Sequence, residues 1–284
     1  MALTEPARGA RIRGYWAANP CGRDLVGLPD ADPAFFEKHD RILAALYPYF
    51  RELLSWLSEG DGPVLEVGCG LGYATATMAG LGRPVCAVDL TWEAARLTSL
   101  RLARQGLKGW TVAADGAALP FRPGVFGGAM SLGVIHHTDR PERVVAEIHR
   151  VTRPGGRALF MLYNRFSLHT LWILGFLWPV LLFLHAAPAF LRRLAFQVRP
   201  GLKDYWLHER WPAVQDAVNA GTDAYGLRNP LSRLYSRSQA RRLLSPFRVL
   251  RFFAEDSYGP GRDTSLHRWL LPRWGFYLYS RCTA

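Results

Sequence analysis

Residues 64–74 of the chain read VLEVGCGLGYA. A short, mostly apolar strand leads into glycines at positions 68, 70 and 72, and a helix-forming segment follows. Glycine adopts positive φ and leaves the backbone bare, so a ligand can lie against the peptide. A glycine turn between a first parallel strand and its helix is where doubly wound sheets bind nucleotides. The spacing E-x-G-x-G-x-G differs from the dinucleotide fingerprint G-x-G-x-x-G, and an ordinary tight turn is the alternative interpretation.

The 284 residues, 49% of them hydrophobic, favour one sheet domain with a cap or insertion over two independent domains. The formal charge of +12 is almost all arginine, because the only lysines are Lys38, Lys108 and Lys203. One explanation of this arginine bias is genome composition. The other is a function of the basic charge, namely binding to anionic membranes or to nucleic acid. No run of Lys and Arg resembles a nucleic-acid-binding tail, so we expect no nucleic-acid partner.

The cysteines are widely spaced, with no C-x-x-C and no zinc-like histidine spacing: Cys21, Cys69, Cys86 and Cys282. We interpret them as reduced thiols of a cytoplasmic protein, and we expect no metal site. The N-terminal segment carries Glu5 and three arginines without an apolar run, which argues against a signal peptide.

From Pro63 onward strands and helices alternate, which favours an α/β fold with a parallel sheet and right-handed crossovers. Strands are expected at 64–67, 85–89, 110–114, 128–132, 157–163, 248–253 and 275–281. Helices are expected at 73–79, 92–105, 141–151 and 238–244. Before the sheet, a helix capped by Asp32 runs to Leu46, and a second covers 49–57.

Two acids end consecutive predicted strands. Asp89 closes the second strand about twenty residues after the glycine turn, where an acid binds ribose hydroxyls in other nucleotide sites. Asp115 follows the third strand. Helix caps or turn formers are the alternative roles for both, but their shared place at the mouth of the sheet favours ligand roles.

Five motifs in order resemble those of class I S-adenosylmethionine-dependent methyltransferases, in the small-molecule branch that includes the ubiquinone/menaquinone methylases. They are Glu66-x-Gly68-x-Gly70-x-Gly72, Asp89, Asp115-Gly116 with Leu119-Pro120-Phe121, His136-His137, and Arg153-Pro154-Gly155-Gly156. The resemblance covers residues 60–164 closely. It implies a Rossmann-like, seven-stranded, mostly parallel sheet with an antiparallel last strand. One departure is Phe126-Gly127-Gly128, where the family usually has Phe-Asp.

The resemblance implies S-adenosylmethionine as cofactor and S-adenosylhomocysteine as product. It places Glu66 near the methionine ammonium group, Asp89 at the ribose, and Asp115 at the adenine. Trp92 is expected to pack on the adenine ring. The implied cofactor-binding set is Glu66, Gly68, Gly70, Gly72, Asp89, Leu90, Trp92, Asp115, Gly116, Ser131 and Leu132.

Methyl transfer from a sulfonium is an in-line displacement, so the protein contributes chiefly by positioning the acceptor and excluding water. A base is needed only where the acceptor carries a proton of high pKa. The resemblance makes His136 the candidate catalytic base, paired with a lid tyrosine, Tyr15. His137 is expected to buttress the following helix, and a lining role is the alternative for His136.

Residues 166–191 hold no charged side chain and are dense in Leu, Trp, Phe and Ile. A single membrane pass is disfavoured, because strands before and after this segment must join one sheet. A buried helical cap or dimer interface is one interpretation. The other is an interfacial pair of helices that dips into a membrane or admits a greasy acceptor, with arginines at its rim. A true membrane span would require a re-entrant hairpin, hinged near Pro179.

We therefore divide the chain into an N-terminal helical lid (1–60), a cofactor-binding core (61–164), an apolar helical insertion (165–236) and the closing helix and strands (237–284). The predicted function is methyl transfer to oxygen or carbon of a hydrophobic small molecule: a lipid, quinone or secondary metabolite. The alternatives are an RNA or protein methyltransferase, and a non-catalytic, membrane-associated cofactor-binding protein. Peripheral membrane contact and a homodimer stay open at this point.

Overall fold

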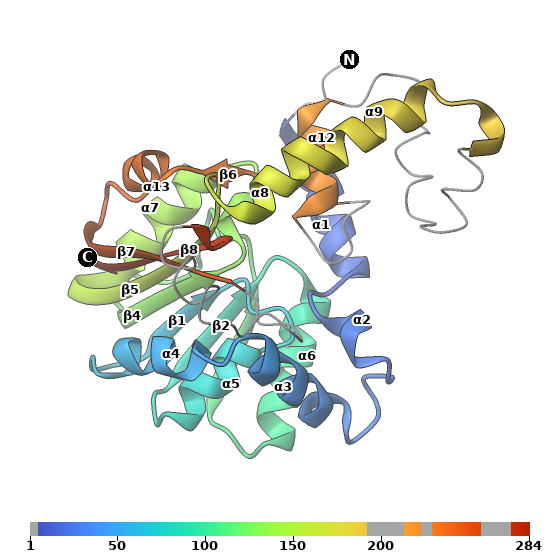
Figure 1. The fold of residues 1–284 in the computed structure, drawn as a ribbon. Helices are drawn as coiled ribbons and strands as arrows, with labels where there is room; N and C mark the ends of the chain where they lie inside the picture. The colour runs from blue at the N-terminus through green and yellow to red at the C-terminus, as the bar shows by residue number, and fades with distance from the viewer. Residues whose placement is uncertain (1–4, 192–212, 223–228, 257–273) are drawn as a thin grey trace.

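The computed structural model describes residues 5–191, 213–222, 229–256 and 274–284. These residues form one eight-stranded sheet of order β3-β2-β1-β4-β5-β8-β7, with β6 paired to the end of β5. Figure 1 shows helices packed on both faces of this sheet. Strand order reverses between β1 and β4, and doubly wound sheets bind ligands in the crevice at such a reversal.

The strands are β1 (Val64–Val67), β2 (Val85–Asp89), β3 (Gly109–Ala113), β4 (Phe126–Leu132), β5 (Thr152–Asn164), β6 (Leu234–Tyr235), β7 (Arg248–Glu255) and β8 (Tyr277–Thr283). β8 runs antiparallel to both of its neighbours, β5 and β7, while β1 to β5 are mutually parallel. The predicted mostly parallel sheet with an antiparallel last strand is confirmed, and the two-residue β6 is an addition to it.

The helices before the sheet are α1 (Glu5–Ala18), α2 (Arg23–Val26), α3 (Phe35–Leu46) and α4 (Phe50–Ser58). Those that connect or follow strands are α5 (Tyr73–Gly80), α6 (Trp92–Arg104), α7 (Pro141–Val151), α12 (Val214–Gly221) and α13 (Arg237–Leu243). α7 and α13 bury apolar side chains against one face of the sheet, and α4 and α5 do so on the other. The two apolar layers fix the sheet between them.

β4 and β5 begin earlier than the sequence predicts. Phe126 pairs with Thr152, and an irregularity before Gly128 restores the parallel register with Arg157. The departure from Phe-Asp has a steric cause, because a Cβ on Gly127 would lie 1.6 Å from the carbonyl oxygen of Asp61. Only glycine fits where the start of β4 passes this close to the chain entering β1.

The segment before the sheet is largely helical, as the sequence predicts. Its first helix, α1, contains Tyr15, which the resemblance places in a lid. The helix predicted from residue 33 begins at Phe35, and the Asp32 carboxylate accepts from the Ala34 backbone nitrogen at 2.8 Å just before it. The segment expected to form a lid thus contains the four helices α1 to α4.

The apolar insertion starts as one helix, not as a hinged pair. α8 (Leu168–Trp172), a π-helical turn labelled η2 (Ile173–Leu177) and α9 (Trp178–Ala186) follow without interruption. The Trp178 backbone nitrogen donates to the Ile173 carbonyl, the i→i+5 pattern of a π turn. Because this wider turn precedes Pro179, the helix continues through the proline, and the hinge that a re-entrant hairpin would need there is absent.

This long helix projects away from the sheet and crosses α12 (Figure 1). Ile173, Leu177 and Leu181 are buried against Ala217 and Val218 of α12. Over Leu168–Ala186 its mean hydropathy is 1.7, and 28% of that segment is buried. Among the described residues it is the one helix whose length and composition would allow a membrane crossing, which by itself is weak support for one.

Candidate active site

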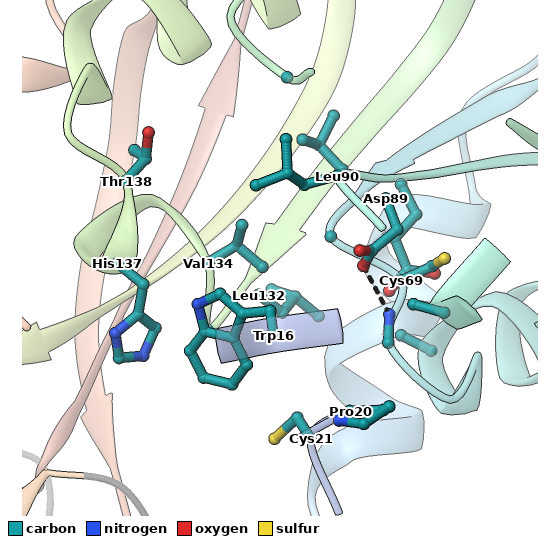
Figure 2. Close-up of a pocket in the computed structure, with 18 of the residues that line it drawn as sticks. Trp16, Pro20, Cys21, Cys69, Asp89, Leu90, Leu132, Val134, His137 and Thr138 are labelled. Atoms are coloured by element: carbon teal, nitrogen blue, oxygen red, sulfur yellow. Dashed lines mark hydrogen bonds between the residues drawn. The ribbon is translucent and has the colours of Figure 1, made fainter. Parts of the chain in front are cut away.

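A cavity of about 410 Å³ opens where β1, β2, β4 and β5 end. The glycine turn, Asp89 and Leu90 form one side of it, and His137 and Val134 form the other (Figure 2). Trp16 of α1 stands across the opening between them (Figure 2). Eight of the predicted cofactor-binding residues line this cavity: Glu66, Gly68, Gly70, Asp89, Leu90, Asp115, Gly116 and Leu132.

The glycine turn is built from residues in left-handed backbone conformations. Gly68 has φ +86°, and its nitrogen donates to the Val88 carbonyl at 2.7 Å. A Cβ there would meet Val134 at 2.1 Å, so the glycine is required for packing. Gly70, at φ +53°, has no atom within 4 Å of where its Cβ would stand. Gly70 therefore presents bare backbone to open space in the cavity.

Asp89 is held rigidly at the end of β2. Its Oδ2 accepts from the Gly70 nitrogen at 3.1 Å (dashed in Figure 2), and its Oδ1 accepts from the Thr91 nitrogen and hydroxyl, each at 2.9 Å. Burial raises the pKa of this carboxyl, and the three donors oppose that rise. The carboxylate thus ties the glycine turn to the start of α6 and borders the cavity.

Asp115 has a partner that the sequence did not suggest. Its Oδ1 accepts from the Ala117 nitrogen at 2.8 Å, and its Oδ2 from Arg140 Nη2 at 2.6 Å. Arg140 also lines the cavity, one residue before the proline that opens α7. An arginine just before that Pro is the one sequence signal that could have pointed to it.

Glu66 is the most buried acid of the site. Its carboxylate accepts a hydrogen bond from the Thr75 hydroxyl of α5. Burial raises the pKa of Glu66 to about 8, with a further contribution from the negative charge of Asp89. At neutral pH the free protein therefore holds a mostly protonated acid beside the glycine turn, and a cation bound there would ionise it.

We expect a proton to leave Glu66 when a cationic ligand binds. The pKa near 8 falls once a positive charge neighbours the carboxylate, so affinity rises with pH from 6 towards 8. Calorimetric titration of S-adenosylmethionine in buffers of different ionisation enthalpy measures the released proton. In Glu66→Gln the release attributable to this group should vanish; the ligand's own amine titrates alike in both proteins. Equal release from both proteins would contradict the assignment.

The structure corrects the predicted roles of the two histidines. His136 is fully buried and stacks on Tyr163 at 3.7 Å, outside the set of residues that line the cavity. His137 lines the cavity instead and packs against Trp16 at 5.0 Å. Both belong to the 3-10 turn η1 (Ile135–His137), where successive side chains point about 120° apart, so only one faces the ligand.

His137 is oriented by the segment after the insertion. Its Nδ1 lies 2.8 Å from the Leu231 carbonyl oxygen, which can only accept, so Nδ1 carries the proton and Nε2 is the acceptor. The Asn229 amide donates to the Ser232 hydroxyl at 2.9 Å and shapes this loop. Burial lowers the pKa of His137 to about 4, which leaves the ring neutral at pH 7.

Four further predicted residues lie outside the cavity lining. Trp92 is the first residue of α6 and is 68% exposed, so its indole does not cover an adenine subsite in this structure. The Ser131 hydroxyl donates to the Val67 carbonyl at 3.1 Å between β4 and β1. Gly72 caps the start of α5, and the Tyr15 ring packs edge-on against Trp16, which takes the lid position.

A group of aromatic residues completes the cavity on the side away from Asp89. Tyr163 of β5 stacks on Phe276 at 4.5 Å, and the Tyr47 and Tyr277 hydroxyls lie 3.3 Å apart. Met161 and Tyr279 also line this part. These residues come from three distant parts of the chain, and no local sequence motif predicts that they meet. Asp89 ends β2, whereas Tyr163 and Tyr277 are paired residues of β5 and β8, with β1 and β4 between them in the sheet. The cavity therefore has a polar half at Asp89 and an aromatic half at Tyr163 and Tyr277.

The residues present fit a cofactor with an adenosine and a cationic amino-acid group. Asp89 offers a fixed carboxylate at the strand end that receives ribose hydroxyls in other nucleotide sites. Gly70 leaves open space against bare backbone, and Glu66 is a buried acid able to pair with a cation. Among the described residues, no three His, Cys, Asp or Glu side chains gather as metal ligands.

Comparison with known proteins agrees with this geometry. A family model described as a methyltransferase domain matches residues 65–160. The ubiquinone biosynthesis O-methyltransferase of Thiobacillus denitrificans is 35% identical over 104 residues, which cover 36% of this chain and 44% of that protein. The protein of the same name from Burkholderia multivorans is 32% identical over 102 residues, with the same coverages. The matched region thus spans less than half of these relatives.

Solved structures share the fold over nearly the whole chain. The geranyl diphosphate C-methyltransferase of Streptomyces coelicolor aligns with a TM-score of 0.55, 13% identity and 97% coverage of both chains. The 1,6-didemethyltoxoflavin-N1-methyltransferase of Burkholderia thailandensis aligns with a TM-score of 0.53 and 18% identity over all of this chain and 91% of that one. Both were solved with S-adenosylhomocysteine bound. These matches and the sheet order show that residues 65–160 form a methyltransferase domain, on a fold shared with enzymes that bind S-adenosylhomocysteine.

Proposed function

We propose that the protein transfers the methyl group of S-adenosylmethionine to a hydrophobic small molecule. The observation that carries the proposal is the divided cavity, in which the polar half at Asp89 adjoins the aromatic half at Tyr163 and Tyr277. A donor bound in one half and an apolar acceptor in the other would meet inside one enclosure. The alternatives, an RNA or protein substrate and a non-catalytic role, are outcomes of the experiment below.

The acidic side chains of the polar half suit the methyl donor. Asp89 would accept from the ribose hydroxyls, Asp115 and Leu90 would border the adenine, and Glu66 would pair with the ammonium group. When bound, S-adenosylmethionine supplies a methyl group already activated by its sulfonium. What the chain itself must do is hold the acceptor atom in line and keep water out.

The apolar lining of the aromatic half suits a hydrophobic methyl acceptor. Met161, Tyr163 and Tyr277 present mainly apolar ring and thioether surface, which favours a flat or branched hydrophobic acceptor. Thr222, at the end of α12, also lines the cavity, so the insertion closes this half. Trp16 packs on His137 at the lid and would exclude water once the acceptor is in place.

His137 is the side chain best suited to orient an acceptor hydroxyl. Its neutral ring keeps Nε2 as a hydrogen-bond acceptor, since Nδ1 donates to Leu231. It would receive the acceptor's proton as the oxygen forms its bond to the methyl carbon.

We expect His137→Phe to lower kcat/KM about 100-fold while cofactor affinity stays unchanged. His136→Phe is the matched control, because that ring is packed on Tyr163 behind the cavity wall and should affect thermal stability more than rate. Steady-state kinetics and thermal denaturation of both variants measure the contrast. A loss of rate in His136→Phe but not in His137→Phe would restore the role first assigned to His136.

The exposed face of the α8–α9 helix supports a greasy acceptor and, as a finer proposal, contact with a lipid surface. Three of its large apolar side chains, Leu171, Phe176 and Phe183, are more than half exposed. No charged residue interrupts them between 166 and 191. A second copy of the chain is the alternative occupant of this face.

The test uses S-adenosylmethionine labelled in its methyl group, incubated with the purified protein and a lysate of the source organism. The products are separated into organic-soluble, aqueous small-molecule, RNA and protein fractions. We expect label in the organic fraction with wild type and none with Asp89→Ala. Label in RNA or protein would contradict the small-molecule proposal and would support an RNA or protein substrate, the alternative suggested by the net charge of +12. Cofactor binding without any labelled product would favour a non-catalytic role.

A further inference from the structure

A buried histidine outside the predicted site borders the polar half of the cavity. His39, in the middle of α3, is 2% exposed and lines the cavity together with Gly22 and Leu71. Its Nε2 is buried and has no hydrogen-bond partner among the residues that the structure describes. Since buried polar atoms are nearly always paired, this nitrogen is a candidate for contact with a ligand.

The proton on this ring can be assigned. Arg101 Nη2 lies 2.8 Å from His39 Nδ1, and a guanidinium can only donate. Nδ1 is therefore the acceptor, and the neutral ring carries its hydrogen on Nε2. Burial lowers the pKa of His39, which keeps the ring neutral near pH 7. His39 thus holds a hydrogen-bond donor at the border of the cavity.

Arg101 fixes this donor to the glycine turn. The guanidinium is fully buried, donates through Nε to the Leu71 carbonyl at 2.6 Å and pairs with the Asp40 carboxylate. Asp40 is held in turn by Gln105 at 2.9 Å. One arginine therefore ties α3 to the loop that contains Gly70, and it places a positive charge behind the imidazole.

The loop after α1 passes over Nε2 without placing a side chain there. Gly22 has φ +85°, and a Cβ built on it would stand 2.8 Å from His39 Nε2. Any other residue would place its side chain against the ring. The glycine therefore leaves Nε2 without a side-chain partner from this loop.

We propose that His39 Nε2 donates to the carboxylate of the cofactor's methionine group. The inference rests on the proposed function and deepens it. Glu66 lines the same cavity and suits the ammonium group, whereas the carboxylate needs a donor. His39 supplies that donor, and its ring is held in place by Arg101. Neither the glycine motif nor the strand-end acids provide this contact.

The experiment compares two ligands on the purified full chain by equilibrium binding. S-adenosylmethionine carries the carboxylate, and decarboxylated S-adenosylmethionine lacks only that group. We expect His39→Phe to weaken S-adenosylmethionine about 10- to 100-fold and to leave the decarboxylated ligand within about twofold. His39→Gln, whose amide nitrogen can reach the position of Nε2, should recover most of the affinity for S-adenosylmethionine.

The outcomes separate this inference from the proposed function. If wild type binds neither ligand, the proposed function fails. If wild type binds both and His39→Phe weakens both equally or neither, the cofactor is bound but His39 does not meet its carboxylate. Thermal denaturation of each variant identifies a fold defect. If His39→Phe has such a defect, the inference is judged on His39→Gln. It is supported if this variant binds S-adenosylmethionine more tightly than the decarboxylated ligand, as wild type does, and contradicted if it binds the two ligands equally.

Discussion

Replacement of Asp89 by alanine should reduce the affinity for S-adenosylhomocysteine at least about 100-fold. The carboxylate would accept from two ribose hydroxyls, and charge-assisted bonds of this kind contribute about 1.5–3 kcal/mol each. It also accepts from the Gly70 nitrogen and from Thr91, so its loss loosens the turn that meets the ligand. Isothermal titration calorimetry measures the change.

The conservative variant and a surface acid calibrate this result. Asp89→Asn keeps one acceptor oxygen and should bind more tightly than Asp89→Ala. Glu142→Ala removes an exposed acid in the first turn of α7 and should bind like wild type. Unchanged affinity in Asp89→Ala would mean that the cofactor does not occupy the end of β2.

Gly70→Ala should weaken cofactor binding about 10- to 100-fold with little further cost to the fold. The space around its Cβ position is open, so no protein atom clashes with the added methyl. A ligand that lies against this backbone would have to move, with a cost typical of overpacking. Binding and thermal denaturation are measured on the same preparation.

Gly82→Ala is the matched control. Gly82 has φ +83° and also has nothing within 4 Å of its Cβ position, but it lies in the turn after α5, outside the cavity lining. Both substitutions force an L-residue into the left-handed region and should destabilise the fold by about 1 kcal/mol. Only Gly70→Ala should bind the cofactor more weakly than wild type. Equal affinities in the two variants would mean that the cofactor does not lie against the glycine turn.

The backbone features of the site could be predicted because they are local. The glycine turn needs positive φ, and Asp89 and Asp115 stand at the ends of parallel strands, which all emerge at one edge of the sheet. The sequence alone was therefore enough to place the glycine turn and Asp89 next to each other. The expected contact of Trp92 with the adenine ring is not seen as a cavity-lining position in the structure. The first residue of a helix can face solvent as easily as a ligand, and the Trp92 side chain is exposed.

The side chains that line the aromatic half of the cavity could not be predicted, because they depend on rotation within η1 and on partners far away in the sequence. Neighbouring histidines differ only in which way a 3-10 turn points them. Tyr47 meets Tyr277 across 230 positions, and His39 meets Arg101 across 62. Tertiary contacts of this separation leave no periodic trace in the sequence. The helix through Pro179 likewise depends on a π turn that no residue pattern announced.

The most direct test of the account is a crystal structure of the protein with S-adenosylhomocysteine. We expect ribose hydroxyls at the Asp89 carboxylate, the methionine group beside Glu66 and His39, and the sulfur facing the half of the cavity lined by Tyr163 and His137. Density outside this cavity, or a sulfur turned away from the aromatic half, would contradict the claim that donor and acceptor meet there.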